Sequence, residues 1–203
     1  MSAFDRPHDV VLVRHGQTQW SASGKHTGRT DVALTDLGRS QADALGGMLD
    51  DSKFALVLAS PLVRAWETME RAGLADSAVA ADDLVEWDYG VYEGRRTIDI
   101  RREISDWSVW SHPMIDGESV EAVGDRADQV IGLTLRTDGP VAVFGHGHIL
   151  RILAARWMGF PAVAGKSLRL DTATVSTLGW ERENRVIRHW NEACHLRSMD
   201  PEL

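Results

Sequence analysis

Apolar residues follow two different patterns along the chain. Three short apolar runs, at residues 10–13, 55–59 and 141–144, are rich in valine, leucine and alanine, which is typical of strands buried on both faces of a sheet. Between them lie segments with apolar residues every three or four positions, as amphipathic helices have. Residues 174–179 and 186–190 alternate apolar and polar, which predicts two late strands.

Two of the predicted helices have clear start signals. Thr35 is the expected N-cap of a helix with Asp36 in its first turn, and this helix is predicted to run to about Asp50. Ser60 and Pro61 predict a second start, with the serine as N-cap and the proline at the first helical position. The predicted buried faces are Leu62, Ala65, Trp66 and Met69 in the second helix, and Val120, Val123, Ala127, Val130 and Ile131 in a third.

Strands that alternate with helices, including a buried helix over residues 149–158, predict an α/β fold. We expect a three-layer sandwich with a mostly parallel central sheet flanked by helices. No linker interrupts the chain, so residues 1–203 are expected to form a single domain. Ligands of such sheets bind at the carboxyl ends of the strands. Three strands are predicted to end just before Arg14, Ser60 and Gly145, which places the chemistry at one edge.

Composition narrows the function classes. The chain has 22 Lys+Arg and 30 Asp+Glu, a net charge of −8, which disfavours nucleic acid or an anionic membrane surface as a partner. A small anionic ligand stays compatible, because a local cluster of arginine and histidine outweighs a distant acidic surface. Cys194 is the only cysteine, the first residues lack an apolar signal core, and no run of 18 apolar residues occurs. We therefore expect a cytoplasmic protein with no nucleic-acid or membrane partner.

Basic side chains gather at the predicted sheet edge. Arg14 and His15 follow the first strand and precede Gly16, whose missing side chain permits close backbone approach. Arg64 lies in the first turn of the second helix, where free N–H groups attract anions and a guanidinium adds paired donors. His146 follows the third strand and can also donate to an anion.

Each of these signals has an ordinary structural alternative. His15 alone would suit a solvated surface turn, and Arg64 alone would suit an ion pair with Glu67 on the helix surface. His146 and His148 form a His-Gly-His sequence that suggests a zinc site, but no further ligand stands at a spacing typical of zinc sites. No metal site is therefore predicted.

A carboxyl group in residues 84–94 would supply a proton. Glu86, Asp88 and Glu93 are the candidates, and periodicity does not choose among them. A carboxyl group among the aromatic residues of this stretch is expected to have a raised pKa, which suits a general acid. Two arginines, two histidines and one acid are the groups that phosphoryl transfer to a nitrogen nucleophile needs without a metal.

Four segments in chain order resemble the motifs of the histidine phosphatase superfamily, which includes the cofactor-dependent phosphoglycerate mutases. They are Leu12-Val13-Arg14-His15-Gly16-Gln17-Thr18, Leu34-Thr35-Asp36-Leu37-Gly38 with Gln41-Ala42, Ser60-Pro61-Leu62-Val63-Arg64-Ala65 with Thr68, and Phe144-Gly145-His146-Gly147 with Leu150-Arg151. The resemblance covers roughly residues 10–160 and implies a phosphoglycerate mutase-like fold. Four matches in order make chance agreement improbable.

Carried over residue by residue, the resemblance implies a catalytic set of Arg14, His15, Arg64, Glu86 and His146. In this set His15 is the phosphorylated nucleophile, the arginines and His146 bind the phosphoryl group, and Glu86 donates the proton. Glu86 is chosen because the family's acid opens a Glu-x-x-x-Gly pattern that residues 86–90 match. The implied substrate- and phosphate-binding residues are Ser21, Thr27, Gly28, Tyr89, Gly147 and His148.

The chain departs from the mutase pattern in two places. Ser21 stands where many members have asparagine, and its hydroxyl can still donate to phosphate. The mutases hold the second anionic group of a bisphosphoglycerate with an adjacent arginine pair. Here Arg95-Arg96 and Arg101-Arg102 follow the Glu86 motif too closely to match that pair. This difference favours a phosphatase over a mutase.

The sequence therefore predicts a metal-independent phosphatase without a cofactor. It would hydrolyse small phosphate monoesters, as a sugar phosphate or bisphosphate phosphatase or a broad acid phosphatase, through a phosphohistidine. Its partners would be the phosphorylated substrate and phosphate ion. The alternatives are a cofactor-dependent phosphoglycerate mutase and a non-catalytic phospho-ligand-binding module. A homodimer through apolar residues near Phe160, a lid or core role for Trp107 and Trp110, and a C-terminal tail that closes over the site are left open.

Overall fold

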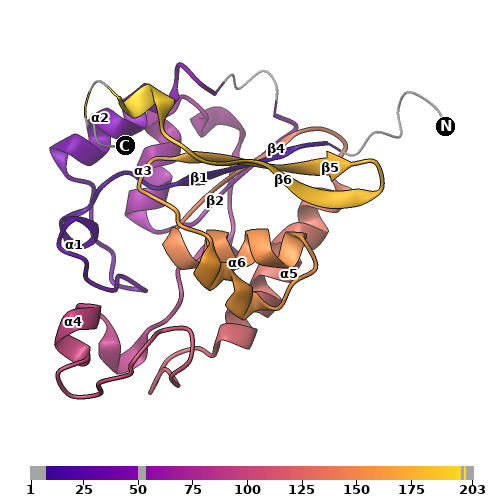
Figure 1. Cartoon of the computed structure of the whole chain (residues 1–203). Helices are drawn as coiled ribbons and strands as arrows, with labels where there is room; N and C mark the ends of the chain where they lie inside the picture. Colours follow the sequence, from indigo (N-terminus) through magenta and orange to yellow (C-terminus); the bar gives the residue numbers. More distant parts are fainter. Residues whose placement is uncertain (1–7, 50–53, 198, 200–203) are drawn as a thin grey trace.

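Six strands form one sheet in the order β3-β2-β4-β1-β5-β6 (Figure 1). The computed structural model describes residues 8–49, 54–197 and 199. The strands are β1 (Val10–Arg14), β2 (Leu56–Ala59), β3 (Ala78–Ala80), β4 (Val141–Gly145), β5 (Val175–Glu181) and β6 (Asn184–Glu192). The first four are mutually parallel, whereas β5 and β6 add to the sheet in antiparallel fashion. The predicted mostly parallel sheet is confirmed, and the short edge strand β3 was not predicted.

Helices connect the strands and cover both faces of the sheet. The α-helices are α1 (Gln19–Ala22), α2 (Asp36–Leu45), α3 (Val63–Arg71), α4 (Thr97–Ile100), α5 (Val120–Arg136) and α6 (Gly147–Trp157). The 3-10 helices are η2 (Ala75–Ser77), η3 (Asp82–Leu84), η4 (Gly90–Tyr92), η5 (Ala162–Ser167) and η6 (Cys194–Leu196). In Figure 1, α2 and η6 lie on one side of the sheet, and α5 and α6 lie on the other.

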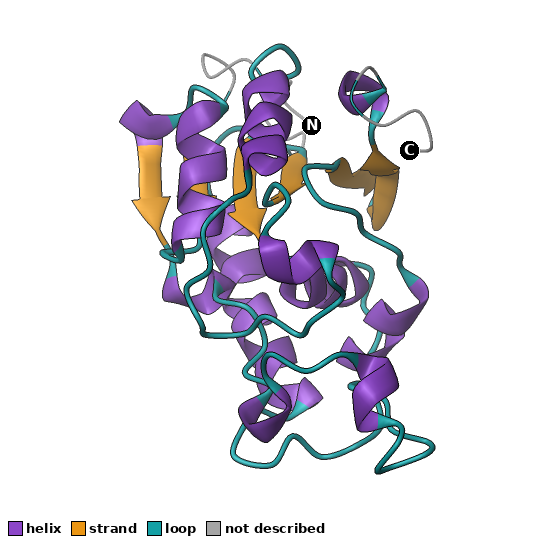
Figure 2. Ribbon diagram, turned by 90° about the vertical axis from the view of Figure 1, so that its left-hand side faces the viewer, coloured by secondary structure: helices purple, strands orange, loops and turns teal. Residues whose placement is uncertain are grey.

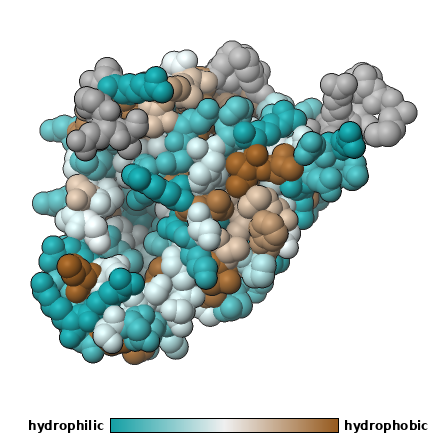
Figure 3. All heavy atoms as spheres, in the orientation of Figure 1, coloured by the Kyte–Doolittle hydropathy of each residue, from teal (hydrophilic) through white to brown (hydrophobic). Residues whose placement is uncertain are grey.

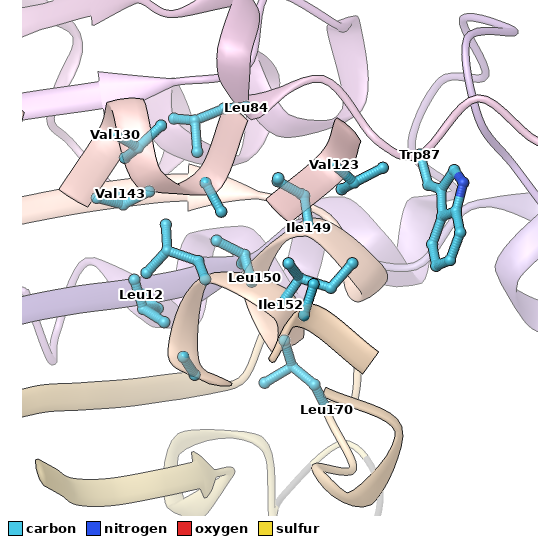
Figure 4. Close-up of a cluster of buried hydrophobic side chains, with 14 of the residues drawn as sticks. Leu12, Leu84, Trp87, Val123, Val130, Val143, Ile149, Leu150, Ile152 and Leu170 are labelled. Carbon is cyan, nitrogen blue, oxygen red and sulfur yellow. The ribbon is translucent and has the colours of Figure 1, made fainter. Parts of the chain in front are cut away.

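Successive residues of the central strands point into two separate cores, which gives the predicted three layers. Leu12 packs with α5 and α6 (Figure 4), whereas its neighbour Val13 packs with α2 and α3. In β4, Val143 and Phe144 divide in the same way. Because both faces of each strand are buried, the strands read as continuous apolar runs rather than alternating ones.

Two predictions about the helix ends are wrong. Ser60 does not cap α3: the N-cap is Leu62, without a side-chain hydrogen bond, and the Asp31 carboxylate instead accepts from the backbone N–H of Val63 at 2.8 Å. Helix α2 ends at Leu45 rather than near Asp50, which lies outside the described residues. Two glycines follow Leu45, and glycine has a low helix propensity.

The buried face of α3 also differs from the prediction. Ala65 and Met69 are buried as expected, whereas Leu62 and Trp66 are only half-buried. Arg64 and Thr68 take part of the buried face. The face of α5 is confirmed at all its interior positions, with Val120 half-buried at the first turn.

Beyond the carboxyl edge of the sheet the chain forms a lobe of short helices and loops that includes α4 (Figures 1 and 2). Trp107 lies fully buried in this part of the core, and Trp110 is half-buried against it. Among the described residues, no helix is both long and apolar enough to cross a membrane.

Candidate active site

A cavity of about 200 Å³ lies at the carboxyl edge of the sheet. It is lined by Arg14, His15, Ser21, Gly24, Lys25, His26, Thr27, Glu86, Tyr89, Gly147, His148, Arg151 and Leu170. Eight of the eleven predicted site residues are among them. The other three, Gly28, Arg64 and His146, lie directly behind its wall and do not line the cavity.

His15 is held as a neutral imidazole with a defined proton position. Its Nδ1 lies 2.7 Å from the carbonyl oxygen of Gly16, and because a carbonyl only accepts, Nδ1 carries the proton. Burial lowers the pKa of His15 well below its ordinary value, and the Arg64 and Arg14 charges lower it further. Nε2 therefore carries the lone pair, and it has no hydrogen-bond partner among the described residues.

The segment after His15 is fixed by close backbone packing. A Cβ on Gly16 would lie 2.3 Å from the carbonyl oxygen of Gly38 at the start of α2. The backbone N–H of Gly16 donates to the Thr68 hydroxyl of α3 at 3.0 Å, and that hydroxyl donates to the carbonyl of Arg64. The loop after His15 is thus packed against two helices.

Arg64 and His146 form a buried hydrogen-bonded chain beside His15. The Nε–H of Arg64 donates to Nδ1 of His146 at 3.0 Å, so Nδ1 is unprotonated and Nε2–H donates to the Ser60 hydroxyl at 2.8 Å. Burial and then the Arg64 charge lower the pKa of His146 well below its ordinary value. Its ring centroid is 5.2 Å from that of His15. Ser60 therefore orients His146 instead of capping a helix.

The remaining donors of Arg64 hold a neighbouring loop. They bind the backbone carbonyls of Thr27, Gly28 and Thr30, and the side chain is fully buried. The ion pair with Glu67 is not formed. Glu93 accepts from three backbone N–H groups of residues 28–30 and so shapes the same loop.

Arg14 presents its guanidinium to the cavity. One terminal nitrogen donates to the carbonyl of Leu170, whereas Nε is buried without a hydrogen-bond partner in the part of the chain that the structure describes. A Cβ on Gly147 would lie 3.4 Å from this guanidinium and 3.6 Å from the Glu86 carboxylate. Arg14 and Glu86 thus face the same small space, with donors left for an anion.

Glu86 occupies the N-terminus of α6. Its carboxylate accepts from the backbone N–H groups of Trp87 at 3.0 Å, His148 at 2.9 Å and Ile149 at 2.9 Å. The helix begins at Gly147, so two of these donors belong to its first turn, where N–H groups lack helical partners. Backbone donors and the helix dipole both stabilise a charged carboxylate. This setting differs from the purely aromatic one that the sequence suggested.

Aromatic and imidazole rings form the wall opposite Arg14. The Tyr89 hydroxyl lies 2.7 Å from Nδ1 of His148, and His26 packs against Tyr89 with ring centroids 5.0 Å apart. Burial lowers the pKa of His26 to about 4 and that of His148 well below its ordinary value. Burial, and then the Glu86 charge, raise the pKa of Tyr89 well above its ordinary value. This wall is therefore uncharged at neutral pH.

The sequence reasoning missed five lining residues: Gly24, Lys25, His26, Leu170, and Arg151 on α6. Arg151 is rigid, because two of its nitrogens donate to the carbonyls of Gly165 and Lys166 at 3.0 Å and its guanidinium stacks on Trp110 at 4.8 Å. One signal was available for Arg151, which follows the predicted site residue Gly147 by four residues and so lies on the same face of the helix.

The zinc interpretation does not fit the ring contacts. Both nitrogens of His146 are committed to Arg64 and Ser60, and Nδ1 of His148 is committed to Tyr89. Within residues 8–49, 54–197 and 199, no group of three or more His, Cys, Asp or Glu side chains could hold a metal ion.

Comparison with known proteins places the chain in a family. The model of the histidine phosphatase superfamily (branch 1) matches residues 10–193. An acid phosphatase of Mycobacterium tuberculosis is 41% identical over 90% of this chain and 91% of its own length. The sedoheptulose 1,7-bisphosphatase of Saccharomyces cerevisiae is 33% identical over 73% of this chain and 67% of its own. A probable phosphoglycerate mutase of Erwinia tasmaniensis is 30% identical over 92% and 94%.

A solved structure supports the same relationship. The product of a Mycobacterium tuberculosis open reading frame superposes with a TM-score of 0.86 at 39% identity, over 92% of this chain and 98% of that one. The predicted fold class is thereby confirmed.

Proposed function

Because the chain belongs to branch 1 of the histidine phosphatase superfamily and is a phosphatase, we propose that it hydrolyses small phosphate monoesters through a phosphohistidine on His15. The observation that carries this proposal is the state of His15: neutral, with Nδ1–H bound to Gly16 and a free lone pair on Nε2. A nucleophile must be unprotonated, and this ring is in the required tautomer before substrate binds.

In the first step, Nε2 of His15 attacks phosphorus and the bond to the leaving oxygen breaks. Glu86 delivers a proton to that oxygen, while Arg14 neutralises charge on the transferring group. Arg64 and His146 do not line the cavity, and their nitrogens are engaged with protein groups. We therefore propose that they act through His15, whose pKa the Arg64 charge lowers, and their direct contact with the phosphoryl group stays a prediction. In the second step, Glu86 takes a proton from water, which attacks phosphorus; the P–N bond breaks and inorganic phosphate leaves.

The substrate itself can supply the proton that Glu86 delivers to the leaving oxygen. A phosphate monoester has a second pKa of about 6, so its monoanion brings a proton into the site under mildly acidic conditions. Glu86 would accept that proton and pass it to the leaving oxygen.

The cavity also suggests the substrate class. A volume of about 200 Å³ suits a phosphate with a small leaving group. Lys25 and Arg151 add positive charge beyond the phosphoryl position, and the Tyr89, His148 and His26 wall offers polar edges for hydroxyl groups. We therefore favour sugar phosphates and bisphosphates, the latter being the substrate class in the name of the yeast relative.

A phosphoglycerate mutase is the second candidate, because one relative has that name. Arg95 and Arg102 pair with Glu103 and Asp99, Arg96 pairs with Asp99, and Arg101 donates to the carbonyl of Trp107. None of these four arginines lines the cavity. With them engaged elsewhere, a phosphorylated intermediate would leave, which supports hydrolysis over isomerisation.

The first experiment measures inorganic phosphate release in EDTA from p-nitrophenyl phosphate, 3-phosphoglycerate, and sugar mono- and bisphosphates. We expect turnover that EDTA does not reduce, with His15→Ala inactive. Glu86→Gln should still give a burst of p-nitrophenol, because this leaving group needs no acid, and then turn over slowly. Near wild-type turnover by His15→Ala would falsify the mechanism, and faster interconversion of 2- and 3-phosphoglycerate than hydrolysis would establish the mutase.

Four further expectations stay predictions: one domain over residues 1–203, a cytoplasmic location, homodimer formation and closure of the tail over the site. Phe160, which bears on the dimer, is 51% exposed. The tail from residue 194 lies partly outside the described residues.

A further inference from the structure

The loop of residues 170–174 wraps the segment that carries the nucleophile. The carbonyl of Leu170 accepts from the Arg14 guanidinium, and the backbone N–H of Ala173 donates to the carbonyls of Arg14 at 3.1 Å and His15 at 3.0 Å. The N–H of Arg14 donates to the carbonyl of Thr174 at 3.3 Å. The backbone of His15 and both ends of Arg14 are thus held by this one loop.

This loop is not in a conformation that its own sequence favours. Ala173 is fully buried and has φ of +54°, in the left-handed region that an L-residue with a Cβ rarely occupies. Such a residue persists only where its surroundings hold it in place. The geometry that lets one N–H reach two carbonyls therefore depends on contacts from elsewhere in the chain.

One such contact comes from the end of β6. Asn191 accepts from the backbone N–H of Asp171 at 2.7 Å, and its amide donates to the Asp171 carboxylate at 2.7 Å. The backbone N–H of Asn191 donates to the Ser176 hydroxyl at 2.9 Å, which fixes Asn191 on β5. The second carboxylate oxygen of Asp171 accepts from the exposed Arg169.

A second contact comes from η6. Nε2–H of His195 donates to the carbonyl of Ala173 at 2.9 Å, so the imidazole reaches the strained residue itself. Leu196 beside it is fully buried in the same cluster as Ala173 and Val13. Both contacts come from the last part of the described chain and converge on the loop next to Arg14 and His15.

We infer that Asn191, Asp171 and His195 are positioning residues, which act through the Leu170–Thr174 loop to aim the Arg14 guanidinium and the His15 ring at the phosphoryl group. None of these three residues lines the cavity. Within the loop, only Leu170 does. The inference rests on the proposed function, since it assumes that Arg14 and His15 act on phosphorus.

The two-way Asn191–Asp171 bond permits a test by exchange. Asn191→Asp alone sets two carboxylates against each other and removes the amide donor. Adding Asp171→Asn restores one donor and one acceptor in reversed places, and the backbone N–H of residue 171 still has an oxygen to donate to. Asn184→Asp, at the exposed start of the same strand, adds the same charge away from the loop and is the matched control.

Inhibition by vanadate and by phosphate distinguishes a loss of positioning from a loss of folding. Vanadate resembles the five-coordinate transition state of phosphoryl transfer, whereas phosphate resembles the ground state. We expect N191D to lower kcat about 10-fold and to weaken vanadate inhibition about 10-fold, with phosphate inhibition changed less than about 3-fold. The exchange variant should recover most of this loss, and N184D should match the wild type.

His195 gives a second route should N191D fail to fold. His195→Gln keeps an N–H donor and should retain most vanadate affinity, whereas His195→Leu should lose it. Equal losses of vanadate and phosphate affinity, or no recovery in the exchange variant, would refute the positioning role. His15→Ala run in parallel separates the two ideas: its activity tests the proposed function, and an inactive H15A beside an unaffected N191D would overturn only this inference.

Discussion

At the scale of single residues, the chemistry of the site depends on which groups are charged. Burial and two arginines disfavour a charged His15, and the Gly16 carbonyl places its one proton on Nδ1. His146 has the opposite tautomer, because an arginine can only donate to its Nδ1. Neighbouring imidazoles thus have different roles, one with a free lone pair and one bound at both nitrogens.

The lowered pKa of His15 has a consequence for the pH profile. A histidine with an ordinary pKa of about 6.5 would be mostly protonated at pH 5 and lose its nucleophilic nitrogen. The lowered pKa of His15 keeps its ring unprotonated to a lower pH than that of an ordinary histidine, so the enzyme's activity should fall only as the pH drops through a value well below 6.5. We expect kcat/KM between pH 4 and 8 to show no acid limb near 6.5; a midpoint at 6.5 would contradict the neutral nucleophile.

At the scale of elements, the free N–H groups at the N-termini of α6 and α3 donate to carboxylates from other parts of the chain. The Glu86 carboxylate accepts from free N–H groups in the first turn of α6, which begins at Gly147, and so fixes the proposed proton donor to that helix. Asp31 serves α3, whose first turn carries Arg64. In both cases a carboxylate from a preceding loop satisfies free N–H groups and brings a site residue to its place.

Removing the Asp31 carboxylate should loosen α3. Asp31→Ala is expected to cost about 1 kcal/mol, the usual effect of losing an N-cap. For a chain of this size, that lowers the Tm by roughly 2–4 °C. Thermal unfolding of Asp31→Ala beside Asp125→Ala, which removes an exposed carboxylate from the middle of α5, checks the expectation. Equal Tm values in the two variants would show that Asp31 does not cap the helix.

Helix α6 also brings Arg151 to the cavity wall, with no acidic partner among the described residues. If the substrate carries a second anionic group, Arg151→Gln should lower kcat/KM for a sugar bisphosphate by about 10-fold or more, as loss of a charge-assisted hydrogen bond does. p-Nitrophenyl phosphate should change by less than about 3-fold. Arg156→Gln is the control. Arg156 lies on α6 like Arg151, but it pairs with Asp128 of α5 outside the cavity. A uniform loss for both substrates would argue against this selectivity.

At the scale of the whole molecule, a net acidic chain builds a basic pocket. On the face that Figure 3 shows, hydrophilic residues cover most of the surface and apolar residues form separate patches. Three arginines, Arg14, Arg64 and Arg151, lie at the carboxyl edge of the sheet, and burial lowers the pKa of each. Four histidines beside them are neutral for the same reason: His15, His26, His146 and His148.

These histidines make stability depend on pH. Each has a lower pKa folded than unfolded, so the unfolded chain binds more protons below pH 6.5 and stability falls as the solution becomes acidic. For His26, with a pKa of about 4 in the fold, the loss at pH 5 is about 2 kcal/mol. His26 by itself should lower the Tm by roughly 4–8 °C between pH 7 and pH 5, so the drop in Tm should be smaller by about that amount in His26→Gln than in the wild type. A Tm that rises on acidification would contradict this account.

The sequence by itself determined five of the six strands, the helices α2, α3, α5 and α6, and that three strands end at one edge; it did not predict β3 or α4. Those features depend on local periodicity and on the parallel order of α/β units, and eight of the eleven predicted residues line the cavity there. The tertiary structure decided the rest. Ser60 orients His146 instead of capping a helix, Asp31 caps α3 in its place, and the left-handed Ala173 holds the nucleophile segment. The tautomers and the lowered pKa values likewise follow from burial and from partners far away in the chain, and no local sequence pattern encodes them.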